Sequence, residues 1–582
     1  MGKDTILVDI EGYGKIEVER GISILSVIQK LGIKKEDNNL IVGALYNNRI
    51  IGLEYLIKRS CRIKFLTLET ENGMEIYRRS LVLLLHAAFK KKINSFYKLK
   101  IEHSLNKGYY FSIEKIESNS AERGSIKDKE KIKKSGIEEI SEEISKEDVN
   151  GIVSEMKRLV NEKRPFIKQE MEVEDALDIF ENHGLWDRYW LLRYQDHPRA
   201  SLYTLEGCTI LAQGPLVPHT GYLKIFSVTK KNHGLILNFP LPETPLELPK
   251  SIKQEKLFQI FSEHREWTRI LDVDSVGKLN KLIIEGGIDN LIWVSEGLHE
   301  KKIAQIADII SRNVRSKRII LMAGPSSSGK TTFAKRLTIQ LLANGIKPEV
   351  ISLDNYYLPR EQIPKDENGK LDFESLYALD LELIQKHLKM LLEGKPVTVP
   401  KYDFKTGQRK KEGISIKIDK NQIVIIEGIH GMNEKLTSNI SKDEKFKIYI
   451  SALTQLNLDY VNRIPTSTVR LIRRIVRDNQ FRAYTAKQTI TQWPSVRAGE
   501  EKHIFPFQEE ADIMFNSSLV YELAVLRGFL EPLLKQIEDS EEIYTEAKKL
   551  LHFISNFVYI SPDHVPLTSI LREFIGGSGF RY

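Results

Sequence analysis

The sequence predicts a multidomain protein in which α+β units precede a C-terminal α/β domain with a parallel sheet. The chain has 582 residues, more than one hydrophobic core usually organises, so three or four domains are expected. Alternating apolar and polar residues near the N-terminus indicate strands with one exposed face. Much later, continuous aliphatic runs alternate with amphipathic segments, which indicates buried parallel strands joined by helices.

The composition is that of an ordinary soluble protein, with 41% hydrophobic and 29% charged residues. No apolar run is long enough to cross a bilayer, and the first residues lack a signal-peptide core. The two cysteines, Cys61 and Cys208, lie far apart, which argues against a disulfide framework and favours a reducing compartment. We therefore expect a cytoplasmic location without membrane contact. The net charge of +8 is compatible with anionic partners and decides nothing by itself.

Residues 1–70 have the pattern of a small β-grasp unit. TILVDI and KIEVE form an expected hairpin with Gly12 and Gly14 in its turn, and ISILSVIQKLG is a helix ended by Gly32. IVGALYNNRII and RIKFLTL supply further strands, the first folding back at its two asparagines. The unit resembles the TGS domain at the front of threonyl-tRNA synthetases, and an unrelated α/β module is the alternative.

Residues 71–240 contain helical and strand patterns on both sides of a highly charged segment. This segment, about 114–148, is rich in Lys, Glu and Ser and is expected to be a solvated insertion. The block resembles the second additional domain of threonyl-tRNA synthetase, which hydrolyses mischarged tRNA with histidine and cysteine side chains. The corresponding positions here are Arg79, Leu83, Ala212 and Leu216.

None of these four side chains can bind a metal or transfer a proton at neutral pH. The remaining His86 and His219 are isolated in the sequence. We therefore predict a scaffold or binding module without editing activity. Residues 241–312 follow as a Pro-rich linker with packing helices, and residues 531–582 are expected to be a helical extension.

The most informative motif is a glycine-rich loop between an apolar strand and an amphipathic helix. The strand RIILMA leads into GPSSSGKT, which satisfies G-x-x-x-x-G-K-S/T at residues 324–331. Such a loop lets backbone N–H groups and a helix N-terminus converge on phosphate oxygens. We expect ATP and Mg²⁺ here, with Lys330 reaching the β- and γ-phosphates and Thr331 ligating the metal. The expected nucleotide contacts are Gly324, Ser326, Ser327, Ser328, Gly329, Lys330, Thr331 and Thr332.

Two later strands end in carboxylates. The run QIVIIEGIHG ends its aliphatic stretch at Glu427, and KPEVISLDNYY carries Asp354 at the same point. The carboxyl ends of parallel strands are the edge where ligands bind. Glu427 is therefore a candidate Mg²⁺ ligand, and Asp354 a candidate base for the acceptor hydroxyl. The plainer alternatives are an acidic residue that merely ends a strand for Glu427 and an N-cap or turn carboxylate for Asp354.

A basic helix follows in VRLIRRIVRDNQFR. Four of its arginines fall on one face by helical spacing, and they are Arg470, Arg473, Arg474 and Arg477. A stripe of arginines suits a lid that clamps phosphate oxygens and excludes water. A merely solvated face is the alternative.

Together these passages resemble the uridine kinase and phosphoribulokinase-like family over residues 313–530. The matching stretches are GPSSSGKTT, ISLDNYY, LDFESLYALD, PKYDFKTGQR, IIEGIHG, RLIRRIVRD and FPFQEEADIMFN. With its front half, the chain resembles long bacterial uridine kinase-like proteins. The resemblance implies a β-grasp domain, a synthetase-like α+β domain and a C-terminal P-loop α/β kinase.

The resemblance also assigns roles to single residues. It makes Asp354 the catalytic base, Lys330 and Arg474 further catalytic groups, and Glu427 a metal ligand. It gives Arg477 a contact with ATP, and it places the acceptor among Tyr357, Glu374, Tyr402, Phe404 and Arg474.

Three positions depart from the pattern of uridine kinases. Gly407 replaces a histidine that reads the pyrimidine edge, Tyr484 replaces a lid arginine, and Glu374 replaces a shorter aspartate. Losing a polar reader weakens discrimination among bases and leaves phosphoryl transfer intact.

The predicted function is therefore an ATP- and Mg²⁺-dependent nucleoside kinase that forms a 5′-monophosphate from a uridine- or cytidine-like acceptor. One alternative is an RNA-binding or regulatory protein whose kinase fold senses nucleotide, with RNA contacting the N-terminal half. Another is a kinase of a small hydroxylated compound that is not a nucleoside. The sequence leaves the oligomeric state open.

Overall fold

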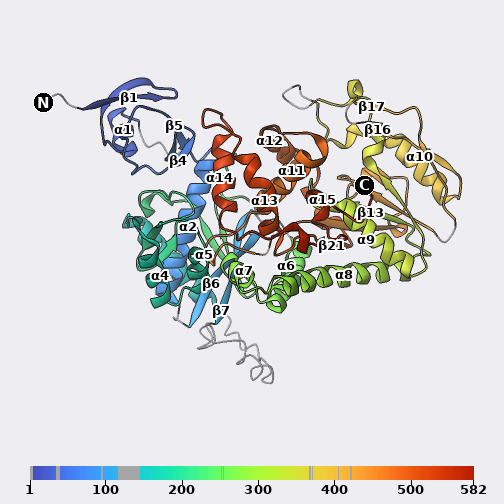
Figure 1. The fold of residues 1–582 in the computed structure, drawn as a ribbon, viewed down its shortest axis with the longest axis horizontal. Helices are drawn as coiled ribbons and strands as arrows, with labels where there is room; N and C mark the ends of the chain where they lie inside the picture. The colour runs from blue at the N-terminus through green and yellow to red at the C-terminus, as the bar shows by residue number, and fades with distance from the viewer. Residues whose placement is uncertain are drawn as a thin grey trace.

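The computed structural model is elongated, with the N-terminal sheet and the parallel sheet at opposite ends (Figure 1). It describes residues 4–33, 40–93, 96–105, 107–115, 144–250, 252, 254–365, 369, 371–403, 406–419, 422–454 and 456–581. Most of the charged segment at about 114–148 therefore lies outside the described residues. The helices α13 and α14 lie between the two ends in this view.

The N-terminal sheet has five strands in the order β2-β1-β5-β3-β4, with β1 and β5 parallel and the other neighbours antiparallel. Asn47 and Asn48 adopt φ of 44° and 59°, as a tight two-residue hairpin turn requires. The expected hairpins and helix are confirmed, while the resemblance to a TGS domain stays a prediction. The elements are β1 (Thr5–Ile10), β2 (Gly14–Glu19), α1 (Ile24–Lys30), β3 (Ile41–Tyr46), β4 (Arg49–Ile51) and β5 (Cys61–Thr67).

A long buried helix, α2 (Glu71–Lys92), joins this sheet to the next part of the chain. The hydroxyl of Thr70 accepts a hydrogen bond from the Gly73 N–H and caps the helix start. Most of the helix is buried, and its apolar side chains share one core with both neighbouring parts. The helix contacts strands of three sheets, which makes it the axis of the N-terminal half.

Two antiparallel sheets surround α2, with strand orders β11-β12-β7-β6 and β10-β9-β8. Their strands are β6 (Tyr97–Leu105), β7 (Gly108–Lys115), β8 (Ile167–Glu172), β9 (Arg199–Leu205), β10 (Cys208–Leu211), β11 (Ser227–Lys231) and β12 (Gly234–Asn238). The accompanying helices are α3 (Lys146–Asn161), α4 (Val173–Asn182) and α5 (Trp186–Arg193). Both cysteines are free. Among the described residues, no helix combines the length and apolar character needed to span a membrane.

Three helices lead into the C-terminal part: α6 (Glu255–Leu271), α7 (Val276–Ile284) and α8 (Ile288–Arg312). The following sheet is wholly parallel, in the order β14-β19-β13-β20-β21, so the predicted parallel sheet is confirmed. Its strands are β13 (Ile319–Ala323), β14 (Pro348–Ser352), β19 (Ile423–Glu427), β20 (Lys445–Ser451) and β21 (Ile513–Asn516).

Helices cover both faces of this sheet, which explains its aliphatic strands. Ile320 and Met322 of β13 share a core with α8, α9, α11 and α13, whereas Ile319 and Leu321 face the core that contains α10. The helices are α9 (Lys330–Ala343), α10 (Leu381–Leu392), α11 (Thr466–Arg482), α12 (Ala486–His503) and α13 (Glu522–Leu534). Two short hairpins pair β15 (Val397–Val399) with β18 (Ile414–Ile416), and β16 (Tyr402–Asp403) with β17 (Gln408–Arg409).

The C-terminal segment contains α14 (Tyr544–Ile554) and the one-turn helix α15 (Arg572–Ile575). It packs on the parallel-sheet part, as expected, and it also contacts the N-terminal sheet. The Thr545 hydroxyl donates to the Asn48 carbonyl at 2.8 Å, and the Asn48 amide donates to the Asp539 carbonyl at 3.1 Å. The segment therefore touches both ends of the molecule.

Candidate functional site

The loop at residues 324–329 connects β13 to α9 through a backbone that favours its particular residues. Ser327 and Gly329 have φ of 59° and 82°, and glycine adopts this region without strain. A Cβ on Gly324 would lie 1.9 Å from the Ile450 carbonyl oxygen, so only glycine fits there. The Lys330 ammonium donates to the carbonyls of Gly324 at 2.9 Å and Pro325 at 3.1 Å. The ammonium therefore lies beside the loop that precedes it.

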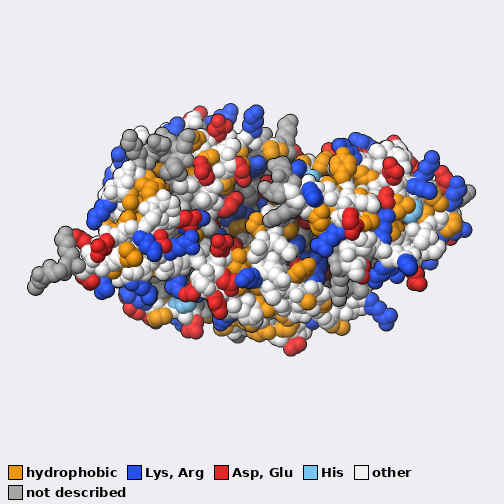
Figure 2. All heavy atoms as spheres, turned by 90° about the horizontal axis from the view of Figure 1, so that it is seen from above, with side chains coloured by type: hydrophobic (Ala, Val, Ile, Leu, Met, Phe, Trp, Pro, Cys, Tyr) orange, Lys and Arg blue, Asp and Glu red, His pale blue; other side chains and the backbone are white. Residues whose placement is uncertain are grey.

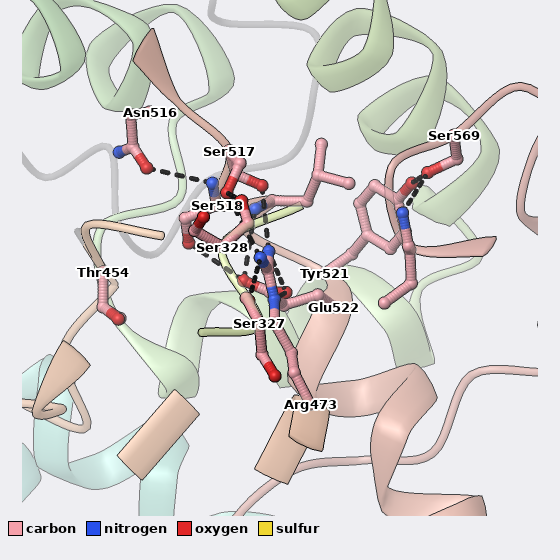
Figure 3. Close-up of polar contacts among 12 residues, drawn as sticks. Ser327, Ser328, Thr454, Arg473, Asn516, Ser517, Ser518, Tyr521, Glu522 and Ser569 are labelled. Carbon is pink, nitrogen blue, oxygen red and sulfur yellow. Dashed lines mark hydrogen bonds and ion pairs between the residues drawn. The ribbon is translucent and has the colours of Figure 1, made fainter. Parts of the chain in front are cut away.

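Two buried arginines of α11 hold the loop by its carbonyl oxygens. Arg470 donates to the Ser326 carbonyl at 2.9 Å and forms an ion pair with Glu500. Arg473 donates to the Ser517 carbonyl at 2.9 Å and to Glu522 at 2.6 Å. Figure 3 shows this guanidinium between Glu522 and the two serines that precede Gly329.

For two of the four arginines, Arg470 and Arg473, the prediction of an arginine lid is wrong. Arg470 and Arg473 are only 1% and 0% exposed, and both guanidinium groups are taken up by the loop and by buried carboxylates. Helical spacing placed the arginines on one face correctly, but that face turns inward, where Glu500 and Glu522 neutralise two of them.

The other two arginines lie on the open side of the loop. Arg474 donates to the Ser326 hydroxyl at 2.8 Å, and Arg477 donates to the Asp478 carboxylate at 2.7 Å. Asp478 also pairs with Arg474 at 3.3 Å. Burial raises the pKa of Asp354, and the charges of Lys330, Arg482 and Arg477 oppose this shift. Arg474 thus contacts the loop directly, and the contact of Arg477 with a nucleotide stays a prediction.

The two strand-end carboxylates meet Lys330 at the carboxyl edge of the sheet. Glu427 ends β19, which pairs with both β13 and β14, and it accepts a hydrogen bond from Ser352 at 3.3 Å. Burial raises the pKa of Glu427 to about 7, although the Lys330 ammonium opposes this shift. Asp354 follows β14, and burial also raises its pKa, again opposed by Lys330. The three groups come from three neighbouring strands of the sheet.

Lys330 responds to the same surroundings. Burial lowers the pKa of its ammonium, and the carboxylates of Glu427, Glu573 and Asp354 counteract this effect. Solvent reaches the Asp354 side chain. Lys330 and Glu427 are partly exposed as well, so the three charged groups do not lie in a sealed core.

Three of the residues expected around the acceptor, Tyr357, Glu374 and Tyr402, lie near one another and near Asp354. The rings of Tyr357 and Tyr402 are 5.5 Å apart, and the Tyr357 hydroxyl donates to the Phe373 carbonyl at 2.9 Å. Burial raises the pKa of Glu374 to about 7, with Glu500 adding to the shift and Arg474 opposing it.

Phe404, the remaining expected acceptor residue, lies outside the described residues. Gly407 occupies the turn of the β16–β17 hairpin with φ of 70° and donates to the Asp403 carbonyl at 2.8 Å. This conformation favours glycine, which accounts for the missing histidine at that position.

Sequence reasoning missed four residues that contact the loop, the start of α9 or the arginines behind them: Glu500, Ser517, Glu522 and Glu573. The Ser517 hydroxyl donates to the Ser328 carbonyl at 2.5 Å. The carboxylate of Glu500 accepts from the Ser326 N–H at 3.0 Å, and that of Glu573 accepts from the Thr332 N–H at 3.0 Å. No local motif marks these positions, since these three contacts each span 174 or more residues of the chain.

The donors at this edge suit Mg²⁺. Within the described ranges, no group of three His, Cys, Asp or Glu side chains could hold a metal by itself. Mg²⁺ needs fewer protein ligands, because it keeps water and shares the phosphate oxygens of its nucleotide. The Glu427 carboxylate and the hydroxyl of Thr331, next to Lys330, are oxygen donors of this type.

The positions that replace the synthetase-like His and Cys residues are structural here. The Arg79 guanidinium donates to the Pro215 carbonyl at 3.0 Å, and Leu83 and Leu216 lie in the core, with Ala212 packed against it. Burial lowers the pKa of His86 to about 3, so this imidazole is neutral. The Nδ1 atom of His219 accepts from the Gly221 N–H at 3.2 Å. The absence of editing activity stays a prediction.

The parallel sheet, the G-x-x-x-x-G-K-S/T loop and the strand-end carboxylates define a P-loop kinase. Residues 319–523 match the model of the phosphoribulokinase / uridine kinase family. Uridine kinase of Brevibacillus brevis is 30% identical over 197 residues, covering 34% of this chain and 83% of that protein. Uridine kinase of Mycoplasma pneumoniae is 34% identical over 212 residues, covering 36% and 90%. The chain belongs to the phosphoribulokinase / uridine kinase family.

Among solved structures, one described as a possible uridine kinase from Bacillus stearothermophilus matches with 17% identity and a TM-score of 0.25. It covers 36% of this chain and 97% of that one, and no argument rests on it. The family match covers the C-terminal part of the chain, so the resemblances of the first 240 residues stay predictions.

We predict that Glu522→Ala destabilises the loop and the domain around it. The substitution leaves the Arg473 guanidinium buried without its carboxylate, which costs about 3–5 kcal/mol. In a domain of this size the midpoint of thermal unfolding should fall by roughly 6–20 °C. Glu531→Ala is the matched control, because its ion pairs with Arg527 and Lys535 are partly exposed and contribute at most about 1 kcal/mol. Equal midpoints for the two variants would contradict this account.

Proposed function

We propose that this protein transfers the γ-phosphate of ATP, in the presence of Mg²⁺, to the 5′-hydroxyl of a nucleoside. The observation that carries the proposal is the meeting of Lys330, Asp354 and Glu427 beside one phosphate loop. A cation for phosphate oxygens, a carboxylate for a metal and a carboxylate for a proton are the parts that phosphoryl transfer needs.

The nucleotide side of the proposal uses the loop and the first turn of α9. The N–H groups at this helix start would bind phosphate oxygens, and the Lys330 ammonium would move from the Gly324 carbonyl to the β- and γ-phosphates. Thr331 and Glu427 would hold the metal. Bound there, Mg²⁺ would neutralise charge that develops on the phosphate oxygens. Arg477 would approach the nucleotide from α11.

On the acceptor side, Asp354 would accept the proton of the 5′-hydroxyl as its oxygen forms a bond to phosphorus and the bond to ADP breaks. Its raised pKa makes it a stronger base than an ordinary aspartate. Arg474, which contacts the Ser326 hydroxyl and stabilises the charged form of Glu374, would lie between the loop and the ribose. Glu374 would then receive the ribose hydroxyls.

The base-binding wall would consist of Tyr357 and Tyr402, with Phe404 expected beside them. Rings of this kind stack on any base. Because Gly407 offers no side chain to read a base edge, we expect loose discrimination among nucleosides. The similarity to uridine kinases favours uridine as the acceptor. The lack of a base-reading side chain at Gly407 also keeps a hydroxylated compound other than a nucleoside as a second candidate.

RNA binding by the N-terminal half has less support than the kinase activity proposed for the C-terminal part. On the face that Figure 2 shows, Lys and Arg side chains are interspersed with Asp and Glu side chains. An RNA-binding surface normally gathers positive charge on one face. RNA contact and the cytoplasmic location therefore stay predictions.

Substitutions at the loop test the proposed chemistry. Lys330→Ala should lower kcat/KM for ATP by about 100-fold or more, because it removes a charge that stabilises the transferring phosphate. Asp354→Asn should bind Mg-ATP at least as tightly as the wild type and lower kcat by about 100- to 10,000-fold. ADP release measures turnover, and Lys347→Ala, an exposed lysine before β14, is the matched control. Wild-type turnover in Lys330→Ala would reject the assignment.

A panel of acceptors identifies the substrate class. Uridine, cytidine, purine nucleosides, ribose and pantothenate-like alcohols are each offered with Mg-ATP, and ADP release is measured. We expect pyrimidine nucleosides to be phosphorylated fastest. Purine nucleosides should also be phosphorylated, because no side chain at Gly407 reads the base edge and discrimination among bases is weak. If only a compound other than a nucleoside is phosphorylated, the proposed acceptor class is wrong.

The pKa of Glu374 predicts a pH dependence. With a pKa of about 7, its carboxylate is ionised above that pH and becomes protonated below it, so acceptance of two ribose hydroxyls weakens as the pH falls. KM for the nucleoside should rise about tenfold from about pH 8 to about pH 6. In Glu374→Gln this rise should disappear, and KM should stay high. An unchanged slope in that variant would assign the pH dependence to another group.

A further inference from the structure

The end of the chain lies against the phosphate loop. A Cβ placed on Gly329 would be 2.6 Å from the Ile570 side chain, and the Lys335 ammonium donates to the Arg581 carbonyl at 2.5 Å. The Arg473 guanidinium, which holds the loop, lies 4.9 Å from the centre of the Phe574 ring. Residues 562–581 thus form a strap over the loop and α9.

The strap is held in shape by its own side chains. The guanidinium of Arg572 donates to the carbonyls of Pro562, Val565 and Gly576. Three backbone segments of the strap therefore meet at one cation, which keeps the short helix α15 facing the loop.

The strap brings the Glu573 carboxylate to the start of α9. Its Oε2 atom accepts from the Thr332 N–H at 3.0 Å and from the Thr332 hydroxyl at 2.7 Å. Thr332 is the third residue of a helix that begins at Lys330, and the first N–H groups of a helix are the ones it offers to anions.

The charge of Glu573 also reaches the centre of the proposed site. It favours the charged form of the Lys330 ammonium and raises the pKa of the Glu427 carboxyl. An anion of this chain therefore occupies a donor that the proposed function assigns to a phosphate. A carboxylate and a phosphate group cannot share that donor, and their like charges repel each other.

Glu500 differs from Glu573, although it also accepts from a loop N–H group. Glu500 is fully buried and paired with Arg470, so it belongs to the permanent frame of the loop. Glu573 is partly exposed and lies on a helix of one turn near the end of the chain. The Glu573 carboxylate can therefore turn away from the Thr332 N–H while Ile570 and Phe574 of the strap stay buried in the core.

We propose that residues 562–581 are an autoinhibitory strap, and that Glu573 competes with a nucleotide phosphate for the Thr332 N–H and hydroxyl. The Glu573 carboxylate must leave the start of α9 before the triphosphate can bind fully. This inference rests on the proposed function, because it requires that the loop binds a nucleoside triphosphate.

Substitution of Glu573 in the full-length protein tests the strap. Titration calorimetry with Mg-ATP should give a Kd about tenfold lower for Glu573→Ala than for the wild type, because the competing carboxylate is gone. Glu573→Gln keeps the size and an acceptor oxygen but loses the charge, so its Kd should lie between the two. Glu542→Ala removes an exposed glutamate of the same C-terminal segment and should bind like the wild type. An unchanged or higher Kd in Glu573→Ala would overturn the strap.

Hydrogen exchange gives a second reading that needs no substitution. Backbone N–H groups of α15 should exchange faster when the wild-type protein is saturated with Mg-ATP, because Glu573 no longer ties this helix to the start of α9. Slower or equal exchange would contradict release. If the wild type binds Mg-ATP and Glu573→Ala binds it with the same Kd, the autoinhibitory role of the strap is rejected and the proposed function is not. Absence of Mg-ATP binding in both proteins would reject the strap and the proposed function together.

Discussion

The candidate site depends on two buried ion pairs beneath the phosphate loop. Arg470 pairs with Glu500 and Arg473 with Glu522, and each guanidinium also binds a backbone carbonyl of the loop or of the adjoining Ser517. A buried charge without a partner is costly, so the four side chains keep one another in place. At Ser326 the carbonyl accepts from Arg470 and the N–H donates to Glu500, so one ion pair binds both polar groups of this peptide segment. The pairs therefore fix the conformation of the loop from its inner side.

The parallel sheet supplies the second constraint. Its alternate side chains belong to two different cores, so the register of each strand is fixed and a shift by one residue would expose the aliphatic positions. This register puts Glu427 at the end of β19, beside Ser352 of β14 and Met322 of β13. Packing within the sheet thus determines which strand-end group lies near Lys330. Burial raises the pKa of this group, Glu427, to about 7.

Local patterns predicted a large part of this arrangement. The strands, the glycine-rich loop and the strand-end carboxylates could be found from sequence because each depends on neighbouring residues. The inward direction of Arg470 and Arg473 could not, since helical spacing tells which residues share a face but not what that face meets. Glu500, Glu522 and Glu573 come from distant parts of the chain, and their contacts depend on tertiary packing. The C-terminal segment, which had no motif, proved to join the N-terminal sheet at Asn48 to the phosphate loop at Thr332.

A structure of the protein with Mg²⁺ and a non-hydrolysable ATP analogue is the most direct test of the central claim. The account predicts phosphates along the start of α9, the Lys330 ammonium turned from the Gly324 carbonyl toward them, and the metal between Glu427 and the phosphate oxygens. A nucleotide bound elsewhere, with Lys330 still on the Gly324 carbonyl, would contradict it.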